Sequence, residues 1–316
     1  MTDRTVSIVV SVFNEAEGLA SFWRALDASL SSLPDERLEV LWVNDGSTDS
    51  SQRVIDELIA TQASARVAHV TIELSRNFGH EAAMIAGIDH ASGDAIVCMD
   101  ADEQHPPDKL PEIVRAHREG ADIVLMERLR RGDNGALKNL LSRAFYSLLN
   151  SLSVFEFQDN STDFFLVSRR VSEVLRSNFR ERTRFLRGFI QTIGFERRVL
   201  TFEAPPRAHG RSSYSYASLT KLALDAIFSF SNKPLLLSVL VSLAFVGFTF
   251  VFATYSLYMF ITSKTIPSGY TTIVMFMSGS FSLLFILLTI LSLYFERAIH
   301  EMRGRPIYIV KEKRSR

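Results

Sequence analysis

The chain has 316 residues, with 35 Lys and Arg against 35 Asp and Glu, so its formal net charge is zero. A neutral total gives no support to nucleic-acid binding, which requires a basic face to neutralise phosphates. The charges are unevenly placed, because residues 234–295 carry a single one, Lys264. This pattern excludes intrinsic disorder and a wholly soluble protein. We expect a polar globular part of roughly 230 residues, then an apolar tract, then a short basic tail.

The single cysteine, Cys98, lies in an apolar run and is expected to be buried. One cysteine provides neither a disulfide framework nor a zinc site, which favours a reducing compartment. The N-terminus runs directly into a strand-like stretch, without the apolar core and cleavage site of a signal peptide. We therefore expect the polar part to be cytoplasmic.

The first 130 residues alternate short apolar strands with helical patterns. Strands are predicted at residues 6–12, 38–43, 67–74 and 95–99, and apolar residues at helical spacing fill the intervals. This alternation predicts an α/β fold, with a mostly parallel sheet covered by helices on both faces. Ligands of such sheets bind beyond the carboxyl ends of the strands.

Carboxylates stand at these strand ends. Asp45 follows the second strand, and Asp100 and Asp102 close the fourth. In extended backbone, residues i and i+2 point the same way, so the last two carboxylates share one side. Paired hard oxygen ligands suit Mg²⁺ or Mn²⁺, which takes further ligands from substrate phosphates. We expect a site for a metal and a diphosphate here.

Two common nucleotide-binding signatures are missing from the sequence. No G-x-G-x-x-G follows the first strand, and no G-x-x-x-x-G-K-[ST] occurs anywhere. Their absence counts against a dinucleotide oxidoreductase and against a P-loop phosphotransferase.

An amphipathic helix is predicted at residues 216–232, where apolar side chains recur at spacings of three and four. Lys221 and Asp225 lie on its opposite face. Two interpretations are equally open: the helix lies along the inner membrane surface, or it packs on its own domain.

Residues 233–296 contain two uncharged stretches, at about 234–263 and 270–295, separated by a Pro-Ser-Gly turn signal. Each is longer than the ~20 residues that cross a bilayer as a helix. We expect two transmembrane helices joined by a very short loop.

The flanks predict the orientation of these helices. Residues 297–316 hold seven Lys and Arg against Glu301 and Glu312, whereas the connecting loop carries only Lys264. Positive flanks stay cytoplasmic. We therefore expect an inner-membrane protein whose two termini and polar domain are all cytoplasmic.

Six segments, taken in chain order, form a recognisable set. They are SIVVSVFNE at residues 7–15, NDGSTD at 44–49, LSRNFG at 74–79, DADEQHPP at 100–107, RFLRG at 184–188 and RAHGRSSY at 207–214. Together they resemble glycosyltransferase family 2. More narrowly, they are similar to its polyprenyl-phosphate branch, the bactoprenol glucosyltransferases and dolichyl-phosphate mannose synthases. The resemblance covers nearly the whole chain.

This resemblance implies a GT-A catalytic domain at residues 1–215. The implied reaction is an inverting transfer of a hexose from a nucleotide diphosphate sugar to a polyprenyl phosphate, such as undecaprenyl phosphate, at the cytoplasmic face of the membrane. UDP-glucose is the favoured donor, and GDP-mannose is the alternative. Family precedent also points to homo-oligomers.

The resemblance also assigns roles to residues. Asp45 would hold the nucleotide base, with Phe13 and Glu15 nearby. Asp100 would face the ribose and diphosphate and contribute to the metal site, and Asp102 would bind the catalytic metal, Mg²⁺ or Mn²⁺. Asp163 matches the candidate catalytic carboxylate.

Three positions depart from the family pattern. Glu103 replaces the usual Leu beside the metal, Phe165 replaces an Arg close to Asp163, and Ser213 replaces a Lys. The last two changes remove positive charge near the expected phosphates.

The acceptor phosphate needs cationic partners, and guanidinium groups bind phosphate in bidentate fashion. The candidates are Arg128, Arg131, Arg207 and Arg211. A phosphate monoester has its second pKa near ~6 and needs little help losing a proton. We therefore expect Asp163 to orient the acceptor or a cation. Four histidines, His80, His90, His105 and His117, lack ligand spacing and are interpreted as structural or solvated.

Two other classes of protein are alternatives to this resemblance. A processive polysaccharide synthase would carry a Gln-x-x-Arg-Trp motif, but the only tryptophans, Trp23 and Trp42, precede the metal motif. A non-catalytic membrane module that kept the fold stays open because of Glu103 and Phe165.

Overall fold

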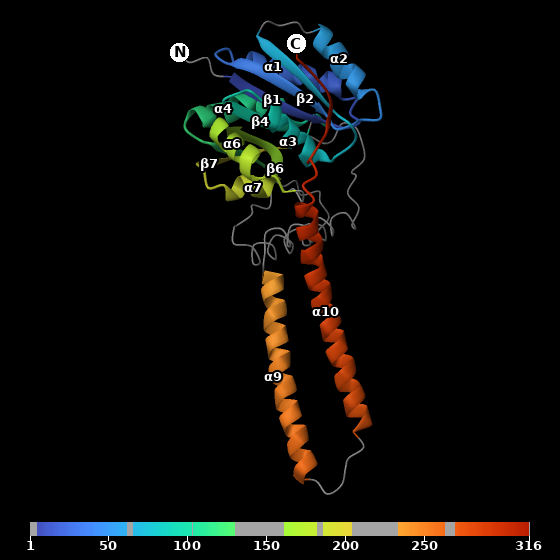
Figure 1. The fold of residues 1–316 in the computed structure, drawn as a ribbon. Helices are drawn as coiled ribbons and strands as arrows, with labels where there is room; N and C mark the ends of the chain where they lie inside the picture. The colour runs from blue at the N-terminus through green and yellow to red at the C-terminus, as the bar shows by residue number, and fades with distance from the viewer. Residues whose placement is uncertain are drawn as a thin grey trace. The chain divides into compact units, whose positions relative to one another are not determined.

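The computed structural model describes residues 5–61, 66–102, 104–129, 161–181, 186–203, 233–262 and 269–315 (Figure 1). The chain divides into two compact units. The first comprises residues 1–146, 157–216 and 305–316, and the second comprises residues 147–156 and 217–304.

The first unit is built on an eight-stranded sheet with the strand order β7-β5-β6-β4-β1-β2-β3-β8. Four neighbouring pairs are parallel (β1–β2, β1–β4, β2–β3 and β5–β7), and the other three are antiparallel. The predicted mostly parallel α/β sheet is confirmed. The strands are β1 (Thr5–Val12), β2 (Arg37–Asn44), β3 (Val67–Leu74), β4 (Ala95–Asp100), β5 (Ile123–Arg128), β6 (Ser161–Ser168), β7 (Arg197–Phe202) and β8 (Val310–Ser315).

Helices pack on both faces of this sheet, because alternate residues of each strand point to opposite faces. Ile8 and Val10 of β1 join a core cluster with the first helix, whereas Val9 faces α3, where a Cβ on Gly87 would lie 2.1 Å from its side chain. The face of the core cluster carries α1 (Leu19–Ser31), α2 (Ser51–Thr61), the 3₁₀ turn η1 (Pro107–Lys109) and α4 (Leu110–Arg118). The opposite face carries α3 (His80–His90), α6 (Arg169–Asn178) and α7 (Leu186–Thr192).

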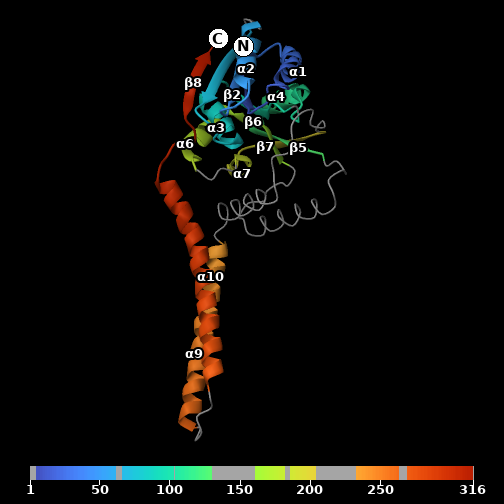
Figure 2. The same cartoon turned by 90° about the vertical axis from the view of Figure 1, so that its right-hand side faces the viewer.

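The C-terminal segment, expected as a basic tail, forms the edge strand β8. It pairs antiparallel with β3 and lies along that edge of the sheet in Figure 2. The hydroxyl of Tyr308 donates to Oδ2 of Asp89 at 2.7 Å, and Nζ of Lys311 lies 2.6 Å from Oε1 of Glu73. A charged strand suits a sheet edge, because its exposed side chains discourage pairing with other chains.

The second unit contains two long helices, α9 (Lys233–Thr262) and α10 (Tyr270–Met302). Both are long and apolar enough to cross a membrane, with mean hydropathy 2.6 over residues 235–259 and 2.3 over residues 272–296. Phe252 of α9 stacks on Phe276 of α10, with ring centroids 5.0 Å apart. The helix α10 continues seven residues beyond Phe295, where its uncharged stretch ends. The predicted amphipathic helix at 216–232 lies outside the described residues.

Candidate active site

The candidate site lies where the parallel strands β1, β2 and β4 end. Ser11 of β1 is in register with Asp100, the last residue of β4. Asp45 directly follows β2. The strand-end carboxylates predicted from the sequence therefore lie at one edge of the sheet, as expected for adjacent parallel strands.

Two loops at this edge are tied together by Asn14, which has a φ of 56°. Its Oδ1 accepts a hydrogen bond from the backbone N–H of Thr48 at 2.8 Å, and its own backbone N–H donates to Oγ of Ser47 at 3.0 Å. Phe13 beside it, which was predicted to lie near the nucleotide base, is 43% exposed, so its aromatic ring is accessible at the site. Glu15 is half-buried, and its backbone N–H donates to Ser51.

Asp45 holds a third loop. Its side chain is buried, and its two oxygens accept the backbone N–H groups of Phe78 at 2.8 Å and Gly79 at 2.9 Å. Gly46 is required beside it, because its φ is +64° and a Cβ there would lie 2.3 Å from the carbonyl carbon of Arg76. Asp45 was predicted to hold the nucleotide base; in this structure its carboxylate fixes the loop that precedes α3.

Asp100 is surrounded by polar side chains. The hydroxyl of Ser11 donates to its Oδ1 at 2.7 Å, and Nδ1 of His80 lies 3.3 Å from the same oxygen. Its backbone N–H donates to Nδ1 of His105 at 3.0 Å, and the His105 ring stacks on Phe164 with centroids 5.2 Å apart. The carboxylate is thus fixed in place from two sides.

His80 bridges two carboxylates. While its Nδ1 faces Asp100, its Nε2 lies 3.4 Å from Oδ2 of Asp163 on β6. Burial alone would lower the pKa of His80, but the carboxylates of Asp100 and Asp163 outweigh it and raise the pKa to about 10. The imidazole is therefore a cation at neutral pH. His80, which was interpreted from the sequence as structural or solvated, thus contacts two carboxylates of the candidate site.

Asp163 lies between two cations. Nε of Arg187, on α7, is 3.0 Å from its Oδ1, and His80 faces its Oδ2. Burial would raise the pKa of Asp163, yet Arg187 and His80 together hold it well below its usual range. A carboxylate with so low a pKa is a poor proton acceptor at neutral pH.

Asp102 stands where a metal ligand was predicted. Its Oδ1 accepts the backbone N–H of Gln104 at 3.1 Å, and Oε1 of Gln104 accepts a hydrogen bond from Arg128 at 3.2 Å. Among the described residues, no three His, Cys, Asp or Glu side chains gather as a complete metal cage. The carboxylates of Asp100 and Asp102 fit a hard divalent cation that takes its remaining ligands from water and substrate phosphates.

The part of the sequence that forms this site matches a known family of enzymes. The sequence model described as glycosyl transferase family 2 matches residues 7–176, more than half of the chain. The chain belongs to glycosyl transferase family 2. It is therefore a glycosyltransferase, and its eight-stranded unit is a GT-A fold.

Similar proteins extend the match along the whole chain. A prophage-derived bactoprenol glucosyl transferase of Shigella flexneri is 31% identical over 310 residues, which is 97% of each chain. The bactoprenol glucosyl transferase of Shigella phage SfV is 31% identical over 98% of this chain and 99% of its own. Among solved structures, glucosyl-3-phosphoglycerate synthase of Mycobacterium tuberculosis aligns with a TM-score of 0.43 and 20% identity, over 71% of this chain and 78% of that chain.

One departure of this glycosyltransferase from the family pattern now has a structural setting. Phe165, in place of an Arg, is fully buried on β6 and pairs in register with Cys98 of β4. Cys98 is itself buried, as predicted, and burial raises the pKa of its thiol well above the ordinary range. The cation beside Asp163 is supplied by Arg187 instead.

Several predicted positions lie outside the described residues: Glu103, Arg131, Arg207, Arg211 and Ser213. Of the four predicted phosphate-binding arginines, the structure describes Arg128, which is linked through Gln104 to the metal motif. Sequence reasoning missed Arg187 and His80. The available signals were their positions, since Arg187 lies in the RFLRG segment and His80 starts a helix directly after a strand-end loop.

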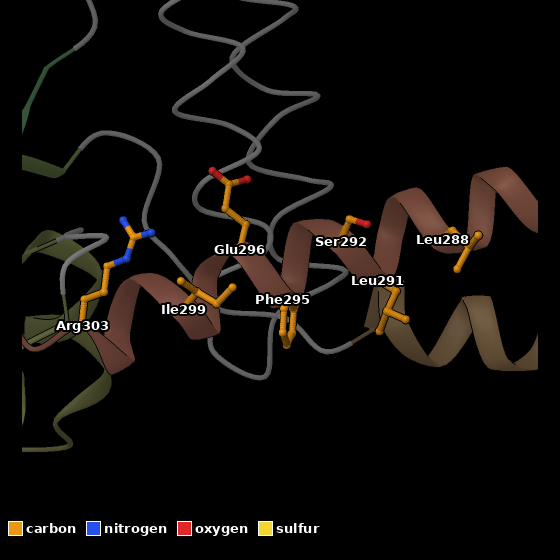
Figure 3. A pocket seen from close by; sticks show the side chains of 7 residues that line it. All are labelled: Leu288, Leu291, Ser292, Phe295, Glu296, Ile299 and Arg303. Atoms are coloured by element: carbon orange, nitrogen blue, oxygen red, sulfur yellow. The ribbon is translucent and has the colours of Figure 1, made fainter.

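The second unit has an open groove of about 570 Å³ along α10 (Figure 3). Its apolar wall begins within the uncharged stretch, and Arg303 stands at its other end, close to the end of the helix. Spacings of three and four residues place the lining side chains on one side of the helix. They are Leu288, Leu291, Ser292, Phe295, Glu296, Ile299 and Arg303.

Proposed function

We propose that this glycosyltransferase moves a hexose, with glucose favoured, from a nucleotide diphosphate sugar to a polyprenyl phosphate at the membrane surface. One observation carries the proposal. Residues on both sides of the two apolar helices, up to 216 and from 305 onward, belong to the unit that contains the carboxylates. The catalytic unit is thus interrupted by a helical hairpin suited to a membrane, and a membrane lipid is the natural acceptor.

The names of the relatives support the two substrates. Both Shigella proteins are called bactoprenol glucosyl transferases, and the match to each covers nearly both chains. A polyprenyl phosphate acceptor and a glucose donor follow by analogy, with UDP-glucose as the favoured nucleotide sugar and GDP-mannose as the alternative.

A divalent cation, Mg²⁺ or Mn²⁺, would be held by Asp102 together with Asp100. It would supply charge neutralisation for the departing diphosphate. Phe13 would offer its exposed ring to the nucleotide base. Asp45 and Glu15 would act on the nucleotide through the loops that they join.

In the reaction, an oxygen of the acceptor phosphate forms a bond to the anomeric carbon, and the bond from that carbon to the diphosphate breaks. A single displacement of this kind inverts the configuration. Because the acceptor has its second pKa near ~6, it is largely dianionic at neutral pH and has no proton to lose. We therefore assign Asp163 a supporting role. Its carboxylate holds the guanidinium of Arg187, whose Nε lies 3.0 Å away, and positive charge of this kind attracts the acceptor phosphate.

The acceptor combines a long apolar chain with an anionic head. Arg128, Arg131, Arg207 and Arg211 are the candidates for the head group in the catalytic unit.

The topology follows from the same hairpin. An even number of crossings returns the chain to the side from which it left, which is required when residues 305–316 complete a unit begun before the helices. The excess of Lys and Arg beyond Phe295 assigns that side to the cytoplasm. We therefore propose an inner-membrane protein with both termini cytoplasmic.

The experiment that tests this function is a donor panel. Membranes containing the protein are incubated with undecaprenyl phosphate and radiolabelled UDP-glucose, UDP-galactose or GDP-mannose, with and without EDTA. The expected result is a chloroform-soluble labelled product from UDP-glucose that disappears with EDTA. Label from GDP-mannose alone would identify a mannose synthase, and no lipid-linked label from any donor would favour a non-catalytic membrane module.

A further inference from the structure

His80 occupies a position that the loop before it makes rigid. It is the first residue of α3, directly after Gly79, whose φ is 97°. The carboxylate of Asp45 holds the N–H groups of Phe78 and Gly79, and the Arg76 guanidinium lies 4.0 Å above the Phe78 ring. The imidazole is therefore held by a loop with little freedom to shift.

The two ring nitrogens reach two carboxylates with different assignments. Nδ1 lies 3.3 Å from Asp100, at the end of β4, and Nε2 lies 3.4 Å from Asp163, on β6. Ser11 contacts both partners of the first pair, because its Oγ lies 3.1 Å from Nδ1 of His80 and its hydroxyl donates a hydrogen bond to Oδ1 of Asp100. An imidazole is the side chain whose two polar atoms point in opposite directions, so it spans two acceptors as an amide cannot.

Electrostatics make this bridge necessary. Side chains of Asp100, His80 and Asp163 are 24%, 35% and 15% exposed, so their charges are only partly screened by water. Two carboxylates near one another in such a place repel, and a protonated imidazole between them offsets that repulsion. Glu81 adds a third carboxylate on the same helix, and its Oε2 accepts the backbone N–H of Leu186, which begins α7. His80 therefore connects α3 to Asp163 on β6, and Glu81 connects α3 to the first residue of α7, the helix that carries Arg187.

We propose that His80 is a positioning residue that sets the separation of Asp100, on the donor side of the site, from Asp163, on the acceptor side. This role rests on the proposed glycosyl transfer. Side-chain contacts form a continuous chain from Ser11 through Asp100, His80 and Asp163 to Arg187. Displacement of one carboxylate relative to the other would misalign the two substrates, and misalignment of about 1 Å costs on the order of 100-fold in rate.

The test uses the full-length protein with Mn²⁺, UDP-glucose and undecaprenyl phosphate. His80→Gln retains one donor group, and His80→Asn is a shorter replacement for use if the first variant does not fold. Asp163→Asn and the double variant complete a cycle. His90→Gln, at the other end of the same helix, is the matched control, since the structure places it in no contact with Asp100 or Asp163. Each kcat is counted per UDP-binding site, measured by calorimetric stoichiometry, so that unfolded protein does not contribute.

We expect His80→Gln to lower kcat at least ~tenfold while the KM for UDP-glucose changes less than about threefold, as for an interaction that matters in the transition state. The double variant should be at most about twofold slower than the slower of the two single variants, because both substitutions interrupt the same chain of contacts. His90→Gln should match the wild type. A kcat loss below tenfold in His80→Gln, or losses that multiply in the double variant, would overturn the positioning role.

Thermal melts of the same proteins separate this proposal from the proposed function. A wild type that makes no lipid-linked product refutes the function but leaves the bridge testable. We then expect the double variant to melt at a higher temperature than the summed single losses predict, because contacting residues are not additive. Additive shifts in melting temperature would overturn the bridge.

Discussion

Nε of Arg187 lies 3.0 Å from Oδ1 of Asp163, although the two residues come from α7 and β6 and are separated by a stretch that includes all of α6. In this pair the candidate catalytic carboxylate, Asp163, holds the guanidinium of Arg187. The second carboxylate oxygen faces His80, so each oxygen of Asp163 lies beside a basic side chain. We therefore infer that Asp163 acts by placing positive charge in the site.

The first prediction concerns Asp163→Asn. We expect a rate loss of roughly 10- to 100-fold, since removing one partner of a buried pair leaves uncompensated charge and a displaced guanidinium. The pKa of Asp163 lies well below its usual range, so its carboxylate does not titrate between pH 6 and 9. The ratio of variant to wild-type rate should therefore be constant over that range, with an acid limb near ~6 from the acceptor phosphate in both proteins.

Asp94→Asn is the matched control for this series. Asp94 directly precedes the opposite end of β4 from Asp100, and its side chain pairs with Arg169 at 3.4 Å. It should leave the rate unchanged. Complete loss of activity at every pH in Asp163→Asn, or disappearance of its acid limb, would identify Asp163 as a true base.

The second prediction concerns the loop junction at Gly46. Gly46→Ala places a Cβ 2.3 Å from the carbonyl carbon of Arg76, in addition to the strain of a φ of +64°. The left-handed strain alone costs about 1–2 kcal/mol, and backbone displacement adds to it. We expect a melting temperature several degrees lower and weaker binding of UDP in calorimetry.

Gly194→Ala separates strain from crowding. Its φ is +79°, but nothing lies within 4 Å of the added Cβ. It should therefore show only the strain cost and bind UDP normally. Equal losses in the two variants would show that the loop junction is not specially crowded.

The third prediction concerns β8. A chain that ends at Gly304 leaves the edge of β3 unpaired and removes the hydrogen bond from Tyr308 to Asp89. Exposed sheet edges promote association, so we expect the truncated protein to melt at a lower temperature and to aggregate in light scattering. Arg314→Ala, which removes an exposed ion pair with Asp56 at 3.1 Å, should cost less than about 1 kcal/mol. A truncated protein as stable as the full chain would contradict the role of β8.

The mostly parallel sheet and the two apolar helices could be predicted because each depends on local patterns, hydropathy and spacing along the chain. The gathering of Asp45, Asp100 and Ser11 at one edge also follows, since the carboxyl ends of parallel strands lie together.

Other features depend on contacts between distant segments and left no local signal. The antiparallel strand β6 inserts between β4 and β5, and the basic tail pairs with β3 more than 200 positions earlier. The same reason explains His80, whose helix brings it between Asp100 and Asp163 although no spacing in the sequence relates the three. The hydrogen bonds from Phe78 and Gly79 to Asp45 were not predictable either, because they join segments more than 30 positions apart.

The fourth prediction is a pH dependence of stability outside the site. Oδ2 of Asp122 lies 2.6 Å from Arg170, and its Oδ1 accepts the hydroxyl of Ser168 at 2.9 Å. Burial acts to raise the pKa of Asp122, but these hydrogen bonds outweigh it and lower the pKa below the ordinary 3.8. A carboxylate with a lowered pKa stabilises the fold above its ordinary pKa, and the contribution is lost as the pH falls through the lowered value.

We therefore expect Asp122→Asn to destabilise the protein by roughly 1 kcal/mol at pH 7, with a difference that shrinks below pH ~4. Urea unfolding of both proteins at several pH values measures it. A difference that persists unchanged at pH 3 would show that packing, rather than the charge, is responsible.

Labelling of the lipid product tests whether the strand-end carboxylates transfer glucose to a polyprenyl phosphate in a metal-dependent reaction. Purified full-length protein is incubated with UDP-[¹⁴C]glucose, undecaprenyl phosphate and Mn²⁺, beside the variant Asp102→Asn. We expect chloroform-soluble label from the wild type, none after EDTA, and a loss of at least ~100-fold in Asp102→Asn. Equal labelling of lipid by the wild type and Asp102→Asn, or labelling that persists in EDTA, would rule out metal-dependent transfer at Asp102.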